Sequence, residues 1–324
     1  MKTSLICRRN RSRRKFCDLP ALYKRKGRLS RRSLKKQRKG TGGQGAPKTV
    51  MNYLSCIHTH TQFCDGKSTM EEFCVAALER GYRSLGFSPH SPLPYESDWA
   101  MKQEDLAAYF GEIARLSALY GGDLEILCGL EWDAESEELP GGLSYVIGSV
   151  HSFSKNGVHF SVDYAKDALS KVVKELYDSD FVALCADYFE LLAEHAAKKQ
   201  VDVVGHFDLP TKYNKDGEFV DEGDPRYLAK AFACADEILA ARPGMIFEIN
   251  TGVMARAGKK TPYPSREILA HLAKRGARFV LTGDCHQARY LSAGYEEALA
   301  LVLQACPDRL LMLTAGGFEK FPLV

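Results

Sequence analysis

The sequence predicts an α/β fold in which parallel strands form a barrel and helices connect them. Three observations support this prediction. From residue 52 onward, short β-branched runs alternate with stretches of helical periodicity, which is typical of βα units. Hydrophobic residues make up 45% of the 324 residues, which is ample for a buried core. Nearly every predicted strand ends in a histidine or a carboxylate, and the C-terminal strand ends of such a barrel converge on one face.

Seven strands are predicted, with an eighth near the C-terminus. In chain order they cover residues 53–58, 84–88, 124–131, 145–151, 201–206, 245–250 and 278–284, and the eighth covers 308–314. Helical segments lie between them. Thr69 and Glu72 fit a capping box at one helix start, and Ser265, after Pro264, suits the N-cap of another. We find no internal repeat.

The cysteines and the apolar runs limit the class of protein. The ten cysteines are scattered singly, with no C-x-x-C pair and no signal-peptide-like segment ahead of them. This pattern favours buried core thiols in a reducing compartment, so we expect a cytoplasmic protein. No apolar run approaches the ~20 residues of a membrane-spanning helix, which argues against membrane insertion.

Residues 1–50 form a basic leader that differs from the rest of the chain. They hold 18 Lys/Arg and one acid, Asp18, for a net charge of +17, and because the whole chain carries +3, the remaining 274 residues carry −14. So much like charge with so few apolar residues predicts disorder. We therefore expect two parts, the leader at 1–50 and a folded body at 51–324.

Four interpretations of the leader stay open. The first is a mis-assigned start, with Met51 as the true first residue just before the first strand. The second is a solvated tail without a specific role, and the third is an arm that binds nucleic acid. An organellar transit peptide is the fourth, because the stretch is rich in Arg and Ser and poor in acids. The acidic body would itself repel a polyanion, so nucleic acid is an expected partner only through the leader.

Six of the nine histidines stand at the exits of predicted strands. They are His58, His60, His90, His151, His206 and His286. By contrast, His195 and His271 fall inside helical patterns and His159 falls in a loop. A single histidine at a strand end is usually a satisfied polar residue, but six of them at one end of a barrel would be costly without a use.

Three carboxylates, Asp65, Glu131 and Asp284, lie beside these histidines in the sequence pattern. Imidazole and carboxylate ligands together suit zinc, manganese or iron, and nine ligands exceed one coordination sphere. We therefore predict two or three divalent metal ions, with Glu131 as a bridge. Clustered metals clamp a phosphoryl group and lower the pKa of a bound water, so the residues predict metal-assisted phosphoester hydrolysis. No GxSxG or Walker loop indicates another chemistry.

Seven motifs resemble those of the PHP (polymerase and histidinol phosphatase) superfamily, most closely its histidinol-phosphatase branch. They are HTHTQFCDG, GFSPHSP, CGLEWD, GSVHSF, GHFDL, EINTG and TGDCH, in this order. The resemblance covers about residues 52–320. It implies a distorted (β/α)7 TIM-like barrel with a trinuclear metal centre at its C-terminal face. It also implies a phosphatase that converts L-histidinol phosphate to L-histidinol in histidine biosynthesis; a PHP phosphoesterase for a nucleotide or sugar phosphate is the alternative.

The resemblance further implies a distribution of ligands among three ions. The sets are His58, His60, Glu131 and Asp284 for the first ion, Glu131, His151 and His206 for the second, and Asp65, His90 and His286 for the third. One departure from the family concerns the second motif, which often reads Thr-Asp-His but here reads Ser88-Pro89-His90. Proline cannot donate a proton to the leaving group, so a metal-bound water or another residue is needed for that step.

Arg256 is the first choice for binding the substrate phosphate, because the guanidinium fork matches phosphate geometry. We expect Glu131, Asp284 and Arg256 to be catalytic, and Arg256 and Glu248 to contact the substrate. A solvated loop arginine is the alternative for Arg256, and Lys259 and Lys260 are expected to face solvent.

The positively charged end of histidinol phosphate needs an acidic partner. Asp133, Glu135, Glu137 and Glu138 follow the third strand and are candidates, although such a run is often a plain solvated loop. The aromatic residues Tyr95, Trp99 and Phe153 are candidates for stacking on an imidazole ring, or else for ordinary packing. A nucleic-acid-associated module is the non-enzymatic alternative. The sequence identifies neither the metal nor an oligomeric state.

Overall fold

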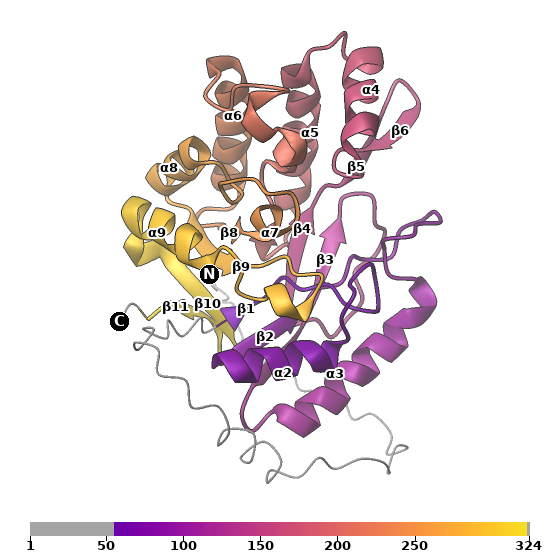
Figure 1. Cartoon of the computed structure of the whole chain (residues 1–324), viewed down its shortest axis with the longest axis vertical. Helices are drawn as coiled ribbons and strands as arrows, with labels where there is room; N and C mark the ends of the chain where they lie inside the picture. The colour runs from indigo at the N-terminus through magenta and orange to yellow at the C-terminus, as the bar shows by residue number, and fades with distance from the viewer. Residues whose placement is uncertain (1–54, 323–324) are drawn as a thin grey trace, which may run out of the picture. The chain divides into compact units, whose positions relative to one another are not determined.

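A computed structural model describes residues 55–322 of the chain (Figure 1). The predicted leader at 1–50 and the first two residues of the first predicted strand lie outside these residues. Within the described part, no helix is long and apolar enough to cross a membrane.

Nine strands form one curled sheet in the order β1-β2-β3-β4-β7-β8-β9-β10-β11. Neighbours run parallel throughout, except β10 and β11, which are antiparallel. The strands are β1 (Ser55–Cys56), β2 (Ser84–Phe87), β3 (Glu125–Asp133), β4 (Tyr145–Ser149), β7 (Val203–Val204), β8 (Ile246–Asn250), β9 (Arg278–Thr282), β10 (Leu310–Thr314) and β11 (Gly317–Lys320). All eight strands predicted from the sequence are present.

The C-terminal end of the barrel closes over seven strands. Thr59 and Cys285, which follow β1 and β9, form a parallel bridge, and the His60 amide donates to the Cys285 carbonyl at 2.8 Å. Along β9, β10 pairs only at Phe279 and Val280, near the start of that strand. β10 and its partner β11 therefore add to the sheet at the N-terminal end of the barrel strands, opposite the end that closes. This arrangement confirms the distorted (β/α)7 barrel.

Helices connect most of the successive parallel strands and pack on the outer face of the sheet, but β3 and β4 are joined by a loop (Figure 1). The α-helices are α2 (Met70–Arg80), α3 (Leu106–Tyr120), α4 (Lys166–Leu176), α5 (Phe181–Ala196), α6 (Pro225–Ala241), α7 (Gly252–Arg256), α8 (Arg266–Arg275) and α9 (Tyr295–Ala305). The predicted capping box of Thr69 and Glu72 begins α2. Ser265 is the N-cap of α8, as predicted, although its side chain makes no capping bond; its amide donates to Asp208 at 3.1 Å.

Two elements were not predicted. A hairpin of β5 (Ser152–Lys155) and β6 (Val158–Ser161) follows β4 directly, and β11 extends the sheet beside β10. Short 3-10 turns complete the connections. They are η1 (Gln103–Asp105), η2 (Leu209–Tyr213), η3 (Lys215–Gly217), η4 (Ala288–Tyr290) and η5 (Pro307–Arg309).

The barrel interior is filled by apolar side chains around Tyr145, which form a cluster separate from the larger core under the helices. The Tyr145 side chain needs the two glycines beside it, because a Cβ atom on Gly86 would lie 2.3 Å from its hydroxyl oxygen and one on Gly129 would lie 2.1 Å from its Cζ. Its hydroxyl donates to the Ile57 carbonyl at 2.5 Å. This packed interior supports the strand ends that carry the site.

Candidate metal centre

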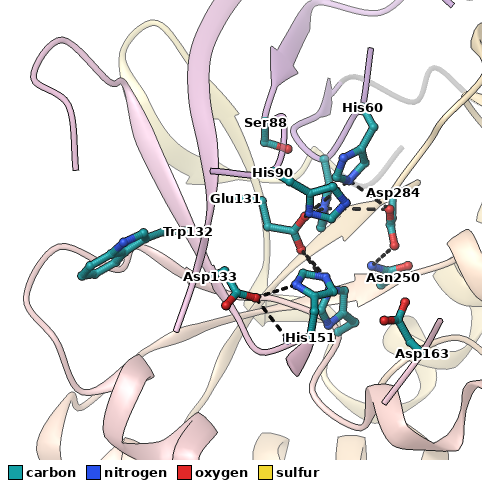
Figure 2. Close-up of polar contacts among 12 residues, drawn as sticks. His60, Ser88, His90, Glu131, Trp132, Asp133, His151, Asp163, Asn250 and Asp284 are labelled. Carbon is teal, nitrogen blue, oxygen red and sulfur yellow. Dashed lines mark hydrogen bonds and ion pairs between the residues drawn. The ribbon is translucent and has the colours of Figure 1, made fainter. Parts of the chain in front are cut away.

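The nine predicted ligands meet at the C-terminal ends of the barrel strands. His58 and His60 follow β1, His90 follows β2, Glu131 lies within β3, His151 follows β4, His206 follows β7, Asp284 and His286 follow β9, and Asp65 lies in the loop after β1. Parallel strands place these ends on one face, so residues more than 200 positions apart become neighbours. Figure 2 shows the Glu131 carboxylate between His90 and His151, whereas Trp132 points away.

Glu131 is the centre of the cluster. Its Oε2 lies 2.8 Å from Nδ1 of His90, 3.3 Å from Nε2 of His58 and 3.4 Å from Nε2 of His60. The other oxygen, Oε1, lies 2.9 Å from Nε2 of His206 and 3.5 Å from Nε2 of His151. Five imidazoles therefore surround one buried carboxylate, as a bridging position requires.

Asp284 and Asp65 extend the cluster on either side of His60. Asp284 Oδ1 lies 3.2 Å from His60 Nε2, and Asp65 Oδ2 lies 3.0 Å from His286 Nε2. Three groups bring possible ligand atoms within 4.8 Å of one another. They are His58, His60 and Asp284; His90, Glu131 and His151; and His60, Asp65, His90 and His286.

The donor set fits divalent metal ions. Buried ring nitrogens of His58, His60 and His90 make no hydrogen bond of acceptable geometry to any described residue, and neither do Oδ1 of Asp65 and Oε2 of Glu131, although Oε2 lies 2.8 Å from Nδ1 of His90. Buried polar atoms without partners are costly and rare in proteins. Imidazole nitrogens and carboxylate oxygens that converge in this way are the ligands that zinc and similar ions prefer.

Electrostatics hold several of these groups in the protonation states that ligands need. Burial alone would raise the pKa of the Glu131 carboxyl, but the imidazoles around it, those of His58 and His90 above all, hold that pKa well below its usual range. Burial also opposes ionisation of Asp284, yet a neighbouring guanidinium keeps its pKa well below the usual value. Burial is the main cause that lowers the pKa of His60. Glu131 and Asp284 are therefore ionised, and the imidazole of His60 is neutral.

Glu248 lies behind His58 and does not face the open side of the site. Its Oε2 accepts from Nδ1 of His58 at 2.8 Å and from the Thr282 hydroxyl at 2.9 Å, and its Oε1 accepts from the Asn250 amide at 2.7 Å and from the His206 backbone N–H. Burial would lower the pKa of His58, but the Glu248 carboxylate raises it. Glu248 is 1% exposed and both of its oxygens are engaged, so its expected substrate contact does not agree with this placement.

Asp133 orients His151 in the way that Glu248 orients His58. The sequence analysis did not predict this role, because it grouped Asp133 with the acidic loop. Its Oδ2 accepts from Nδ1 of His151 at 2.8 Å and from the His151 backbone N–H at 3.1 Å, while Oδ1 accepts from the Glu135 backbone N–H at 2.8 Å. The signal was present, because alternation along β3 puts Glu131 and Asp133 on the same face.

Arg256 ends α7 at the edge of the cluster. Its guanidinium donates to both carboxylate oxygens of Asp284, at 2.8 and 3.0 Å, and lies 2.5 Å from Nδ1 of His286. The side chain remains 31% exposed. The arginine therefore belongs to the site and is not a solvated loop residue.

The expectation that Lys259 faces solvent is wrong. Its side chain is 8% exposed, and its ammonium group contacts the Thr211 hydroxyl at 2.7 Å and Glu222 at 2.9 Å. Lys260 is exposed, as expected. A second pair was missed altogether: Lys212 donates to the carboxylate of Asp163 at 2.9 Å and to its carbonyl at 2.8 Å, next to the site.

In the second motif, Ser88 and Pro89 are held by backbone amides, one that follows β1 and one that lies in β3. Ser88 is buried, and its hydroxyl accepts from the Thr59 amide at 3.3 Å. The Pro89 carbonyl accepts from the Glu131 amide at 3.1 Å. These contacts fix His90 against β3. Among the aromatic candidates, Phe153 packs against Phe160, so it does not line the site.

Comparisons with known proteins agree with this geometry. The family model described as PHP domain matches residues 57–252. A Deinococcus radiodurans protein named "Probable histidinol-phosphatase" is 31% identical over 264 residues, which cover 77% of this chain and 92% of that protein. The Bacillus subtilis protein named "Histidinol-phosphatase" is 26% identical over 267 residues, covering 75% of this chain and 97% of that protein.

The crystal structure of histidinol phosphate phosphatase from Lactococcus lactis, complexed with Zn, L-histidinol and phosphate, has the same fold. Its TM-score is 0.61 at 19% sequence identity, over 82% of this chain and 99% of that chain. The chain therefore belongs to the PHP domain family, in its histidinol-phosphatase branch.

Proposed function

We propose that this chain is a metal-dependent phosphomonoester hydrolase that converts L-histidinol phosphate to L-histidinol and phosphate in histidine biosynthesis. The arrangement of five imidazoles around Glu131 carries the proposal, because it provides ligands for more than one ion at a single open face. The names of the curated relatives and the ligands of the Lactococcus lactis structure support the choice of substrate.

We propose that two or three divalent ions, zinc, manganese or iron, are held by the nine residues predicted as ligands. Bound ions of this kind polarise phosphoryl oxygens and make a hydroxide nucleophile available near neutral pH. Glu131 contributes by remaining ionised between the imidazoles, so that it can bridge two ions. Asp284, held by Arg256, contributes a carboxylate of fixed orientation.

Arg256 is proposed to bind the substrate phosphate. Its planar fork matches phosphate oxygens in pairs, and it lies at the edge of the ligand cluster with part of its side chain exposed. Because Ser88 and Pro89 are turned into the barrel wall, protonation of the leaving alkoxide must be assigned to another group.

Phosphate release from the purified protein, with manganese or zinc supplied, tests the proposal across histidinol phosphate and a panel of nucleotide and sugar phosphates. We expect selectivity for histidinol phosphate and its loss in His151→Ala. His271→Ala is the matched control, because His271 binds Asp236 on the outer helices at 2.8 Å. Strong activity on another phosphoester only would replace the substrate assignment and leave the metal proposal standing.

We further propose that residues 51–324 are the catalytic unit and that the enzyme acts in the cytoplasm. The PHP match and every proposed site residue lie within that range. Removal of residues 1–50 should leave kcat/KM unchanged. Loss of activity together with loss of nucleic-acid binding would instead give the leader a functional role.

A further inference from the structure

The metal centre and Arg256 account for the phosphate end of the proposed substrate, but not for its positively charged end. The following inference rests on the proposed function and asks which residue recognises that cation. Three segments meet beside His90 and His151: the loop after β2, the loop after β3, and the β5–β6 hairpin. Their side chains form a rim, defined here as Tyr95, Trp99, Glu135 and His159.

Glu135 is the centre of this rim. Its Oε2 accepts from the Tyr95 hydroxyl at 2.6 Å and from Nε2 of His159 at 2.9 Å, and its Oε1 lies 3.2 Å from the same nitrogen. The rings of Tyr95 and His159 lie 5.1 Å apart at 70°. The carboxylate is thus oriented by two neighbours from other segments, while Oε1 keeps most of its capacity to accept further hydrogen bonds.

Two contacts connect the rim to the metal centre. The Glu135 amide donates to Asp133, and the other oxygen of Asp133 holds His151. The Trp99 ring lies 4.7 Å from the ring of His90, at 88°, and 5.3 Å from that of His151. Trp99 therefore forms a half-buried aromatic wall next to two proposed ligands, and aromatic faces attract cations.

The other acidic candidates among the described residues are either engaged by other partners or held by no contact that would fix their orientation. Asp133 is 1% exposed and uses both oxygens to hold His151 and Glu135. Asp163 is paired with the Lys212 ammonium. Glu137 and Glu138 are exposed on the loop. Of these carboxylates, Glu135 alone combines a fixed orientation with an oxygen, Oε1, whose single contact, to Nε2 of His159 at 3.2 Å, leaves it able to accept further hydrogen bonds.

We infer that Glu135 binds the positively charged ammonium or imidazolium group of the substrate, with Trp99 as the adjoining wall, and so selects cationic phosphomonoesters. The mode of recognition is a charge-assisted hydrogen bond to Oε1, partly shielded from water.

The test compares kcat/KM for esters with and without a positive charge. Histidinol phosphate and phosphoethanolamine carry a positively charged group on the alcohol part and are called cationic here, whereas the alcohol part of p-nitrophenyl phosphate is neutral. In Glu135→Gln, which has the same shape without the charge, we expect the cationic-to-neutral ratio of kcat/KM to fall about 10- to 100-fold. Most of the change should appear in KM. Glu137→Gln, on the same loop, should leave the ratio unchanged.

A ratio that stays within about twofold of wild type overturns the inference, whether both substrates are unaffected or both lose equally. Equal losses would mean that the Glu135 side chain only orders the loops of the rim through Tyr95 and His159. If the wild-type enzyme hydrolyses phosphoethanolamine but not histidinol phosphate, the proposed function fails, and the phosphoethanolamine ratio still decides the role of Glu135.

Discussion

The floor of the site and its rim are built in different ways. The floor consists of strand ends, where Glu131, Glu248 and His58 are almost completely buried and each meets several polar partners. The rim consists of loops and a hairpin, where Tyr95 is 39% exposed and Glu135 is partly exposed. Buried side chains that are held by several contacts suit a reaction that needs fixed geometry. Solvent-exposed side chains on loops suit the discrimination between substrates.

This difference predicts that floor variants should affect metal binding and the reaction with every substrate, while rim variants should affect one class of substrate. The predictions that follow test that division, beginning with the largest expected effect.

Replacing Glu131 with Gln removes the negative charge at the centre of five imidazoles. We expect kcat/KM to fall by about 10³-fold or more for all phosphoesters, with loss of bound metal measured by elemental analysis. Glu125→Gln is the control, because Glu125 lies at the start of the same strand and pairs with Arg83 at the surface. Full metal content in Glu131→Gln would argue against its bridging role.

Asp133→Asn and Glu248→Gln test the groups that hold the floor from behind. The Asp133 oxygens face backbone N–H groups and an imidazole N–H, and Glu248 faces the His206 N–H and the Asn250 amide, so the NH₂ group of either variant would meet another donor. We expect metal affinity to weaken about 10- to 100-fold.

Competition with a chelator measures that affinity. Glu135→Gln, a rim variant, serves as the comparison and should bind metal with the affinity of wild type. The division between floor and rim breaks down if Glu135→Gln loses metal as readily as Asp133→Asn does.

Arg256→Lys keeps the charge and removes the fork. Because a lysine cannot hold both oxygens of Asp284 and pair with phosphate in the same way, we expect kcat/KM to fall about 10- to 100-fold for cationic and neutral esters alike. Arg275→Lys, which pairs with Asp236 at the end of α8, is the matched control. A loss of kcat/KM confined to cationic esters would mean that Arg256 acts in substrate selection with the rim and does not bind the phosphate.

Much of the floor could be predicted from the sequence, because parallel strands bring their C-terminal ends together whatever their order. The strand predictions at 84–88 and 145–151 agree with β2 and β4 to within two residues. Hence His90 and His151 could be placed near each other before any contact was known. The orientation of Glu248 was harder, since residues at a strand end can face either the substrate or a neighbouring ligand.

Tyr95, Trp99 and Glu135 were candidates for the charged end of the substrate, but the contacts that join them in the rim could not be predicted, because they depend on loop conformations that carry no periodic signal. The β5–β6 hairpin places His159 against Glu135, 24 positions away, and the hairpin itself was not predicted. The pairs Lys212 with Asp163 and Lys259 with Glu222 likewise join irregular segments. Local sequence identifies such residues as polar but does not identify their partners.

His195 provides the smallest test, because it is a buried histidine outside the site. It lies in α5, as its helical pattern predicted, and its Nε2–H donates to the Trp132 carbonyl at 2.8 Å. Burial lowers its pKa to about 4, so the folded protein holds it neutral while the unfolded chain takes up a proton below pH 6.5. Stability should therefore fall as the pH drops from about 6.5 towards 4, by at most about 3 kcal/mol from this residue.

In His195→Gln, which keeps a donor for Trp132 and does not titrate, denaturant unfolding at pH 7.5 and pH 5 should show a smaller loss of stability than in wild type. Equal losses of stability in wild type and His195→Gln would mean that the pKa of His195 is the same in the folded and unfolded states. The comparison also separates the two kinds of buried histidine. His195 contacts a carbonyl, and burial above all, with the nearby Lys198 ammonium, keeps it neutral. His58 and His151 contact carboxylates that orient their ring nitrogens towards a shared centre.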